Sequence, residues 1–138
     1  MAIEYTNPYG CANFNSFNED KVAFVDKTNF IEVIDKLDTK YPILLRPRRF
    51  GKTTFVQMLD YFYDISKKDQ YDEVFRGTKI IEKNLPSHNT YHVLNLEFSE
   101  IYGNTSAQLV EGFTSNIIDS ITDFIDRYPE VNFEVDEY

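Results

Sequence analysis

A short stretch in the first half of the chain combines the residue types that bind phosphate groups. An apolar run at residues 43–45 leads into an arginine-rich turn that ends in Gly51, Lys52 and Thr53, and a helix-like pattern follows. A strand, a loop with inward amides and a helix N-terminus, in this order, hold an anion. Lys52 is then expected to reach the β- and γ-phosphates of a nucleotide, and the Thr53 hydroxyl to bind Mg²⁺. The spacing therefore predicts a site for the phosphate groups of a nucleotide and for Mg²⁺.

The stretch departs at one position from G-x-x-x-x-G-K-[ST], the usual pattern of such a loop. Arg46 stands at the first glycine position, where glycine permits a turn that a side chain resists. A glycine turn followed by a chance Lys-Thr pair is the alternative interpretation. The residues predicted to hold the nucleotide are Arg46, Pro47, Arg48, Arg49, Phe50, Gly51, Lys52, Thr53 and Thr54.

Composition narrows the possible classes of protein. With 138 residues, of which 42% are hydrophobic, the chain is expected to form one folded domain. Its net charge of −9 opposes a general nucleic-acid surface, because phosphate contacts need clustered cations. The single cysteine, Cys11, excludes an internal disulfide and a cysteine-based zinc site. No signal peptide or transmembrane span is recognised, so the cytoplasm is the default location.

Helical and strand patterns alternate along the chain. An irregular leader is expected at residues 1–20. Apolar stripes at helical spacing predict a helix near residues 30–37, one after Lys52, a short one at 71–75, and a long one between Thr105 and Pro129. Strands are predicted at residues 22–25, 43–45 and 91–98.

This alternation predicts an α/β fold with a largely parallel sheet flanked by helices. Ligands bind such sheets at the carboxyl ends of the strands, where the arginine-rich loop would lie. Asp26 or Thr28 is expected to cap the first helix. The aromatic residues on the helical stripes are expected in the core; they are Phe55, Phe62, Phe113 and Phe124.

Three blocks of sequence resemble a known family. They are Val-Ala-Phe-Val-Asp-Lys-Thr-Asn-Phe-Ile at residues 22–31, Leu-Arg-Pro-Arg-Arg-Phe-Gly-Lys-Thr at residues 45–53, and Val-Leu-Asn-Leu-Glu-Phe-Ser at residues 93–99. The chain is similar to the predicted AAA-ATPase-like family of bacterial and archaeal proteins over roughly residues 13–100. Arginine is usual in that family at the position of Arg46.

The resemblance implies a P-loop NTPase fold and ATP binding. In that family this region is the N-terminal part of a longer protein, often with a nuclease-like domain further on. Residues 21–138 would then be the N-terminal portion of the ATPase-like domain, with an incomplete sheet. Residues 135–138, Val-Asp-Glu-Tyr, mimic a Walker B strand end, but no apolar strand precedes them. Hydrolysis is therefore expected to be weak or absent, and the roles of Asp136 and Glu137 stay open.

A second hypothesis is a non-enzymatic protein-interaction module. In this interpretation Arg46, Arg48 and Arg49 contact a protein partner, or the chain associates with itself. Neither nucleic acid nor a membrane is an expected partner.

Overall fold

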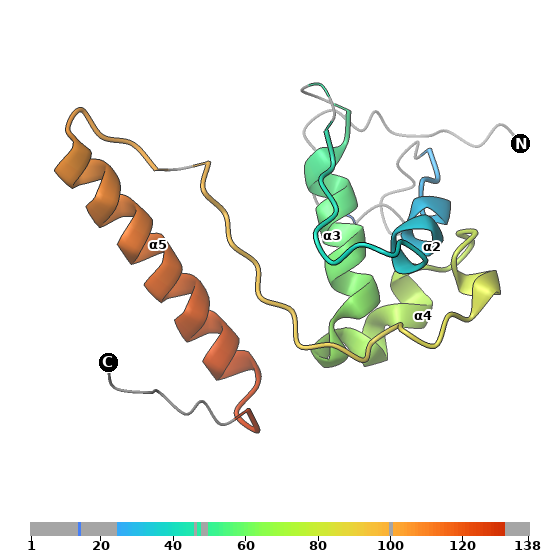
Figure 1. Cartoon of the computed structure of the whole chain (residues 1–138). Coiled ribbons are helices and arrows are strands. Elements are labelled where there is room, and N and C mark those ends of the chain that lie inside the picture. The colour runs from blue at the N-terminus through green and yellow to red at the C-terminus, as the bar shows by residue number, and fades with distance from the viewer. Residues whose placement is uncertain (1–13, 15–24, 46, 48–49, 100, 132–138) are drawn as a thin grey trace, which may run out of the picture. The chain divides into compact units, whose positions relative to one another are not determined.

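The computed structural model describes residues 14, 25–45, 47, 50–99 and 101–131. The chain divides into two compact units, Met1–Tyr91 and His92–Tyr138. The described helices of the first unit are α2 (Asn29–Asp35), α3 (Lys52–Tyr63), the 3-10 helix η1 (Ile65–Gln70), α4 (Tyr71–Val74) and the 3-10 helix η2 (Ile81–Lys83) (Figure 1). The second unit contains α5 (Ser106–Arg127).

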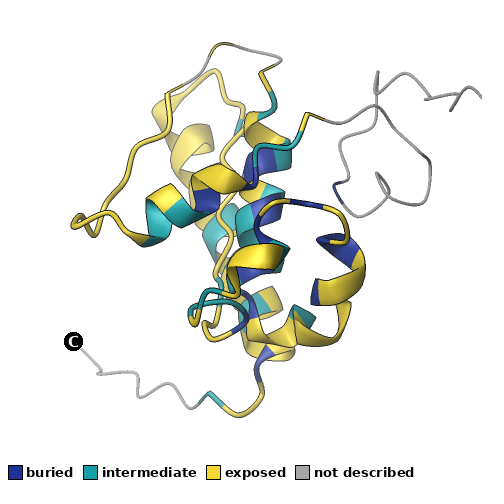
Figure 2. Ribbon diagram, turned by 90° about the vertical axis from the view of Figure 1, so that its right-hand side faces the viewer, coloured by how far each residue is buried: buried dark blue, intermediate teal, exposed yellow. Residues whose placement is uncertain are grey.

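The core of the first unit forms around α3. Phe55, Met58 and Phe62 recur at helical spacing and are buried, as the sequence predicts for one face of an amphipathic helix. They pack with six other buried residues, which are Phe14, Ile31, Tyr71, Val74, Phe75 and Ile80. The burial colours of Figure 2 show this buried face on the helices of the unit. The predicted helices near residues 30–37, after Lys52 and at 71–75 are thus confirmed as α2, α3 and α4.

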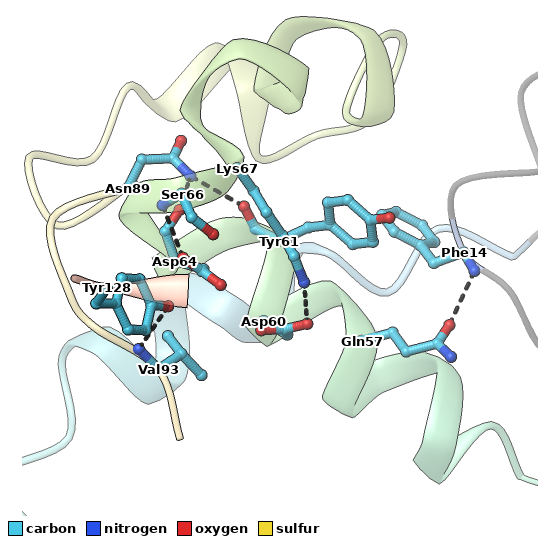
Figure 3. Close-up of polar contacts among 10 residues, drawn as sticks. All are labelled: Phe14, Gln57, Asp60, Tyr61, Asp64, Ser66, Lys67, Asn89, Val93 and Tyr128. Atoms are coloured by element: carbon cyan, nitrogen blue, oxygen red, sulfur yellow. Dashed lines mark hydrogen bonds and ion pairs between the residues drawn. The ribbon is translucent and has the colours of Figure 1, made fainter. Parts of the chain in front are cut away.

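Polar contacts hold the carboxyl end of α3 (Figure 3). Asp64 accepts a hydrogen bond from the Ser66 amide at 2.7 Å. The buried side chain of Asn89 donates to the carbonyl oxygens of Tyr61 and Asp64, at 3.1 and 2.7 Å. Asn89 itself has a φ of 50°, in the left-handed region that asparagine tolerates. These bonds fix α3 against the loop that ends the first unit.

The predicted parallel α/β sheet is wrong. The described residues contain helices and no strand, and their only β pairing is an isolated parallel bridge between Asp64 and Tyr91. Residues 42–45 have no regular structure, and Ile43 and Leu45 are 83% and 86% exposed. An apolar run becomes a strand only when a neighbouring chain pairs with its backbone, and residues 42–45 have no such neighbour among the described residues. Of the predicted strand at 22–25, only Val25 is described, and it is exposed.

The predicted strand at residues 91–98 is also wrong beyond the Tyr91 bridge. Within the second unit its backbone groups bond to side chains instead of to another strand. The Val93 amide donates to the Tyr128 hydroxyl at 3.1 Å (Figure 3), and the Asn116 side chain donates to the Glu97 carbonyl at 2.6 Å. The backbone of this segment is therefore bonded to side chains of the second unit and not to a neighbouring strand.

The predicted long helix is confirmed as α5. The Thr105 hydroxyl accepts from the Gln108 amide at 3.3 Å, and the helix ends before Pro129. The expectation that Phe113 lies in the core is wrong, because its side chain is 46% exposed and stacks on Phe98. Phe124 is only half-buried. Among the described residues, no helix combines the length and the apolar character that crossing a membrane requires.

Candidate functional site

Gly51 marks the point where the loop becomes α3. Its φ of 73° and ψ of 31° lie in the left-handed region, which glycine enters without steric cost and other residues resist. Its carbonyl accepts the first helical hydrogen bond, from the Phe55 amide at 2.9 Å. The helix begins at Lys52, directly after this glycine. The Gly-Lys-Thr sequence therefore forms a sharp turn into a helix, which is the geometry that the sequence predicts for this part of the loop.

The first turn of α3 has amide donors that no described residue accepts. Among the described residues no side chain caps the helix, and no acidic residue lies in its first turn. The amides of Lys52, Thr53 and Thr54 donate to no other described residue. The side chains of Lys52 and Thr53 are exposed, and that of Thr54 is half-buried. Unpaired amides at a helix N-terminus, beside a lysine, favour a bound anion.

The remaining predicted site residues are either exposed or outside the described residues. Pro47 and Phe50 are exposed. Arg46, Arg48 and Arg49 lie outside the described residues, so the phosphate contacts predicted for them stay predictions. Residues 132–138, which contain Asp136 and Glu137, also lie outside.

A hydrogen-bond network fixes the backbone just before α2. Asp26 accepts from the amide and the hydroxyl of Thr28, at 2.9 and 2.7 Å, and from the Lys79 amide at 2.9 Å. The hydroxyl of Thr28, which is fully buried, accepts from the Ile80 amide at 3.2 Å. Neither side chain caps α2, so that expectation is wrong; Thr28 occupies the N-cap position without a capping bond. Both side chains join the start of α2 to the turn before η2.

The pKa of Asp26 reflects this network. Burial acts to raise it, but the hydrogen bonds from Thr28 and Lys79, together with the Lys79 charge, outweigh burial and hold the pKa below its usual value. The Asp26 side chain is therefore an anion that accepts these hydrogen bonds.

Lys27 is the residue near the loop that the sequence does not reveal. Its Nζ atom lies 3.8 Å from the position that a β-carbon on Gly51 would occupy. The sequence carries no signal for this proximity, because Lys27 and Gly51 are 24 positions apart and helical and strand periods relate only close neighbours. The Asp26 and Thr28 contacts to residues 79–80 hold the backbone on both sides of Lys27.

Comparison with known proteins adds one match. The model of the family described as Predicted AAA-ATPase matches residues 8–137. No curated protein and no solved structure matches the chain. The matched region covers nearly the whole sequence and includes the loop, Gly51 and α3. The chain therefore belongs to the predicted AAA-ATPase family.

Proposed function

We propose that this chain binds ATP with Mg²⁺ at the start of α3. The observation that carries the proposal is the left-handed Gly51 followed by Lys52 and Thr53, in a helical turn whose amides have no described acceptor. Membership of the predicted AAA-ATPase family supports nucleotide use. The proposal needs no sheet, because the anion is held by the helix N-terminus and the side chains around it.

Each residue of the loop has a distinct role in this proposal. The Lys52 ammonium binds the terminal phosphates as a point charge, and the Thr53 hydroxyl is a ligand for Mg²⁺. The amides from Arg49 to Lys52 surround the phosphates, and the guanidinium groups of Arg46 and Arg48 add positive charge. Mg²⁺ neutralises phosphate charge and keeps several waters when bound in this way.

Calorimetric titration with Mg²⁺·ATP tests the proposal. The wild-type protein should release or absorb heat on saturation, and Lys52→Ala should weaken binding roughly 10- to 100-fold, because a hydrogen bond to a charged group contributes about 1.5–3 kcal/mol. Lys68→Ala removes an exposed lysine from η1 and serves as the matched control. No binding by the wild type, or equal binding by wild type and Lys52→Ala, would refute the proposal.

We further propose that nucleotide turnover is very slow or absent. Hydrolysis needs a positioned water and an acidic residue near Mg²⁺ in addition to phosphate binding. The candidates for that residue are Asp136 and Glu137, which no apolar strand precedes in the sequence. A phosphate-release assay, with Lys52→Ala as the blank, measures this directly. Fast turnover that disappears in Asp136→Ala would contradict the proposal and assign residues 135–138 a catalytic role.

Self-association is the second candidate function, and one observation favours it. Tyr41, Ile43 and Leu45, directly before the loop, are 83–86% exposed, which is unusual for a contiguous apolar run. A second copy of the chain would cover this surface by packing apolar side chains against it. Sedimentation over a concentration series should show dimers that Ile43→Lys abolishes. A monomer at the highest concentration would exclude this function and leave nucleotide binding untouched.

A further inference from the structure

Lys27 stands at the loop with no partner of opposite charge among the described residues. Its ammonium lies within van der Waals range of a β-carbon placed on Gly51. The ion pairs between described residues of the first unit involve Lys36, Lys67 and Lys83. The carboxylate beside Lys27 in sequence, Asp26, is bound to Thr28 and Lys79. The side chain is half-buried, so it does not simply extend into solvent.

The backbone of Lys27 is fixed on both sides. Thr28, the next residue, is fully buried and bonded to Asp26 and to the Ile80 amide. The Lys27 carbonyl accepts from the Phe30 amide at 3.0 Å as α2 begins. Since the backbone is held in this way, only the flexible side chain of Lys27 determines where its charge lies, and that side chain is turned toward Gly51.

This position is electrostatically unfavourable in the absence of an anion. The N-terminus of α3 carries partial positive charge, and Lys52 in its first turn adds a full one. The first turn contains no acidic residue. A lysine is long enough to move its charge into water at small cost, yet the Lys27 ammonium lies beside Gly51, where it repels the positive end of α3. A bound anion would turn this repulsion into attraction.

We propose that Lys27 is a second phosphate-binding lysine, which contacts the polyphosphate of the nucleotide together with Lys52. This inference rests on the proposed function, because it uses the same site and the same ligand class. It adds that Lys27, from the segment before α2, contacts the phosphates on the side of the site that α3 does not cover. The residue binds phosphate directly, so its effect grows with the number of phosphates on the ligand.

The experiment compares binding of ATP, ADP and AMP to the full chain by calorimetry. Lys27→Gln should raise the Kd for Mg²⁺·ATP about tenfold, which corresponds to ~1.4 kcal/mol. The effect should shrink for ADP and vanish for AMP, while Lys27→Arg should bind ATP nearly as the wild type does. Lys68→Gln is the matched control, since η1 follows the far end of the 12-residue α3, roughly 18 Å from Gly51.

A melting curve of the nucleotide-free protein separates binding from a structural role. If the charge of Lys27 serves nucleotide binding and does not stabilise the fold, Lys27→Gln should leave the Tm of the nucleotide-free protein unchanged or raise it. A lowered Tm with unchanged ATP affinity would overturn the inference and make Lys27 a structural residue. Normal binding by Lys27→Gln, with binding lost in Lys52→Ala, overturns this inference alone. Absence of ATP binding by the wild type overturns the proposed function and this inference with it.

Discussion

Replacing Gly51 by alanine tests the geometry of the site with little steric disturbance. The new β-carbon would lie 3.8 Å from Lys27 Nζ, an ordinary contact, so the main cost comes from the backbone. An L-residue in the left-handed region costs about 1–2 kcal/mol. Alanine also restricts the unfolded chain, which offsets roughly 0.4–1 kcal/mol. The net destabilisation should therefore be about 1 kcal/mol.

Gly77 provides a matched control for this substitution. Its φ of 77° is almost the same as that of Gly51, and nothing lies within 4 Å of a β-carbon placed on it. Gly77→Ala should thus destabilise the free protein by a similar amount, about 1 kcal/mol. The backbone cost is thus alike for the two variants, but Gly51 directly precedes α3 at the proposed site and Gly77 follows α4 away from it.

Urea unfolding followed by circular dichroism gives both stabilities, and Mg²⁺·ATP titration gives both affinities. Gly51→Ala should bind ATP about tenfold more weakly, because the loop must distort to relieve the strain. Gly77→Ala should bind as tightly as the wild type. Gly51→Asn should lose less than Gly51→Ala, since asparagine tolerates the left-handed region. If Gly51→Ala matches the wild type in stability and affinity while Gly77→Ala is destabilised, the left-handed turn at Gly51 is refuted.

Substitutions at three further positions test what holds the first unit together. Asn89→Ala should lower the free energy of unfolding by about 2–4 kcal/mol, because it removes two hydrogen bonds to carbonyl groups at the end of α3 and strains a left-handed backbone. Asn89→Gly should lower the free energy of unfolding less, and equal urea midpoints for the two variants would contradict the contribution of backbone strain. Asp26→Asn places an amide donor against the Lys79 amide and should destabilise at pH 7. Since the folded-state pKa of Asp26 is lowered, the stability that its carboxylate contributes is present above the ordinary value of 3.8 and is lost as the pH falls through the folded pKa. The urea midpoints of wild type and Asp26→Asn should therefore converge as the pH is lowered below 3.8, and a constant gap would contradict this. Burial, followed by the charge of Asp35, raises the pKa of Tyr63, so wild-type stability should fall as the pH rises above the ordinary 10.0, and Tyr63→Phe should flatten that fall in an alkaline titration of the Tm.

Helices were predictable from the sequence because their signals are local. The stripe Phe55, Met58 and Phe62 places one face of α3 in the core, and Thr105 and Pro129 bound α5 through capping and chain-stopping chemistry. Residues three or four apart carry this information, so no knowledge of distant neighbours is needed. The predicted Gly-Lys-Thr turn into a helix depends on the same short-range signals.

The lack of a sheet among the described residues and the position of Lys27 could not be predicted from the sequence, because both depend on contacts between residues far apart in the chain. A strand is defined by its partner, and neither residues 43–45 nor residues 92–98 pair with one among the described residues. Phe113 has the right periodicity for a core residue, but periodicity identifies an apolar face without showing what covers it. Lys27 lies beside Gly51, a residue 24 positions further along the chain, and only the folded chain creates that contact.

The two ends of α3 differ in a way that fits a phosphate site. At its carboxyl end, Asn89 satisfies the carbonyls of Tyr61 and Asp64, and this end is anchored in the core. At its amino end, Gly51 offers no capping side chain, and Lys52 adds the charge that a helix start disfavours. A chain selected only for stability would place a capping serine or aspartate there, as Thr105 caps α5. Local rules are broken where function competes with stability, and the first-turn amides of α3, which have no acceptor among the described residues, all point out of the same end of the helix. The anion that completes them would then stabilise the protein by mass action, so Mg²⁺·ATP should raise the Tm of the wild type and lose this effect in Lys52→Ala.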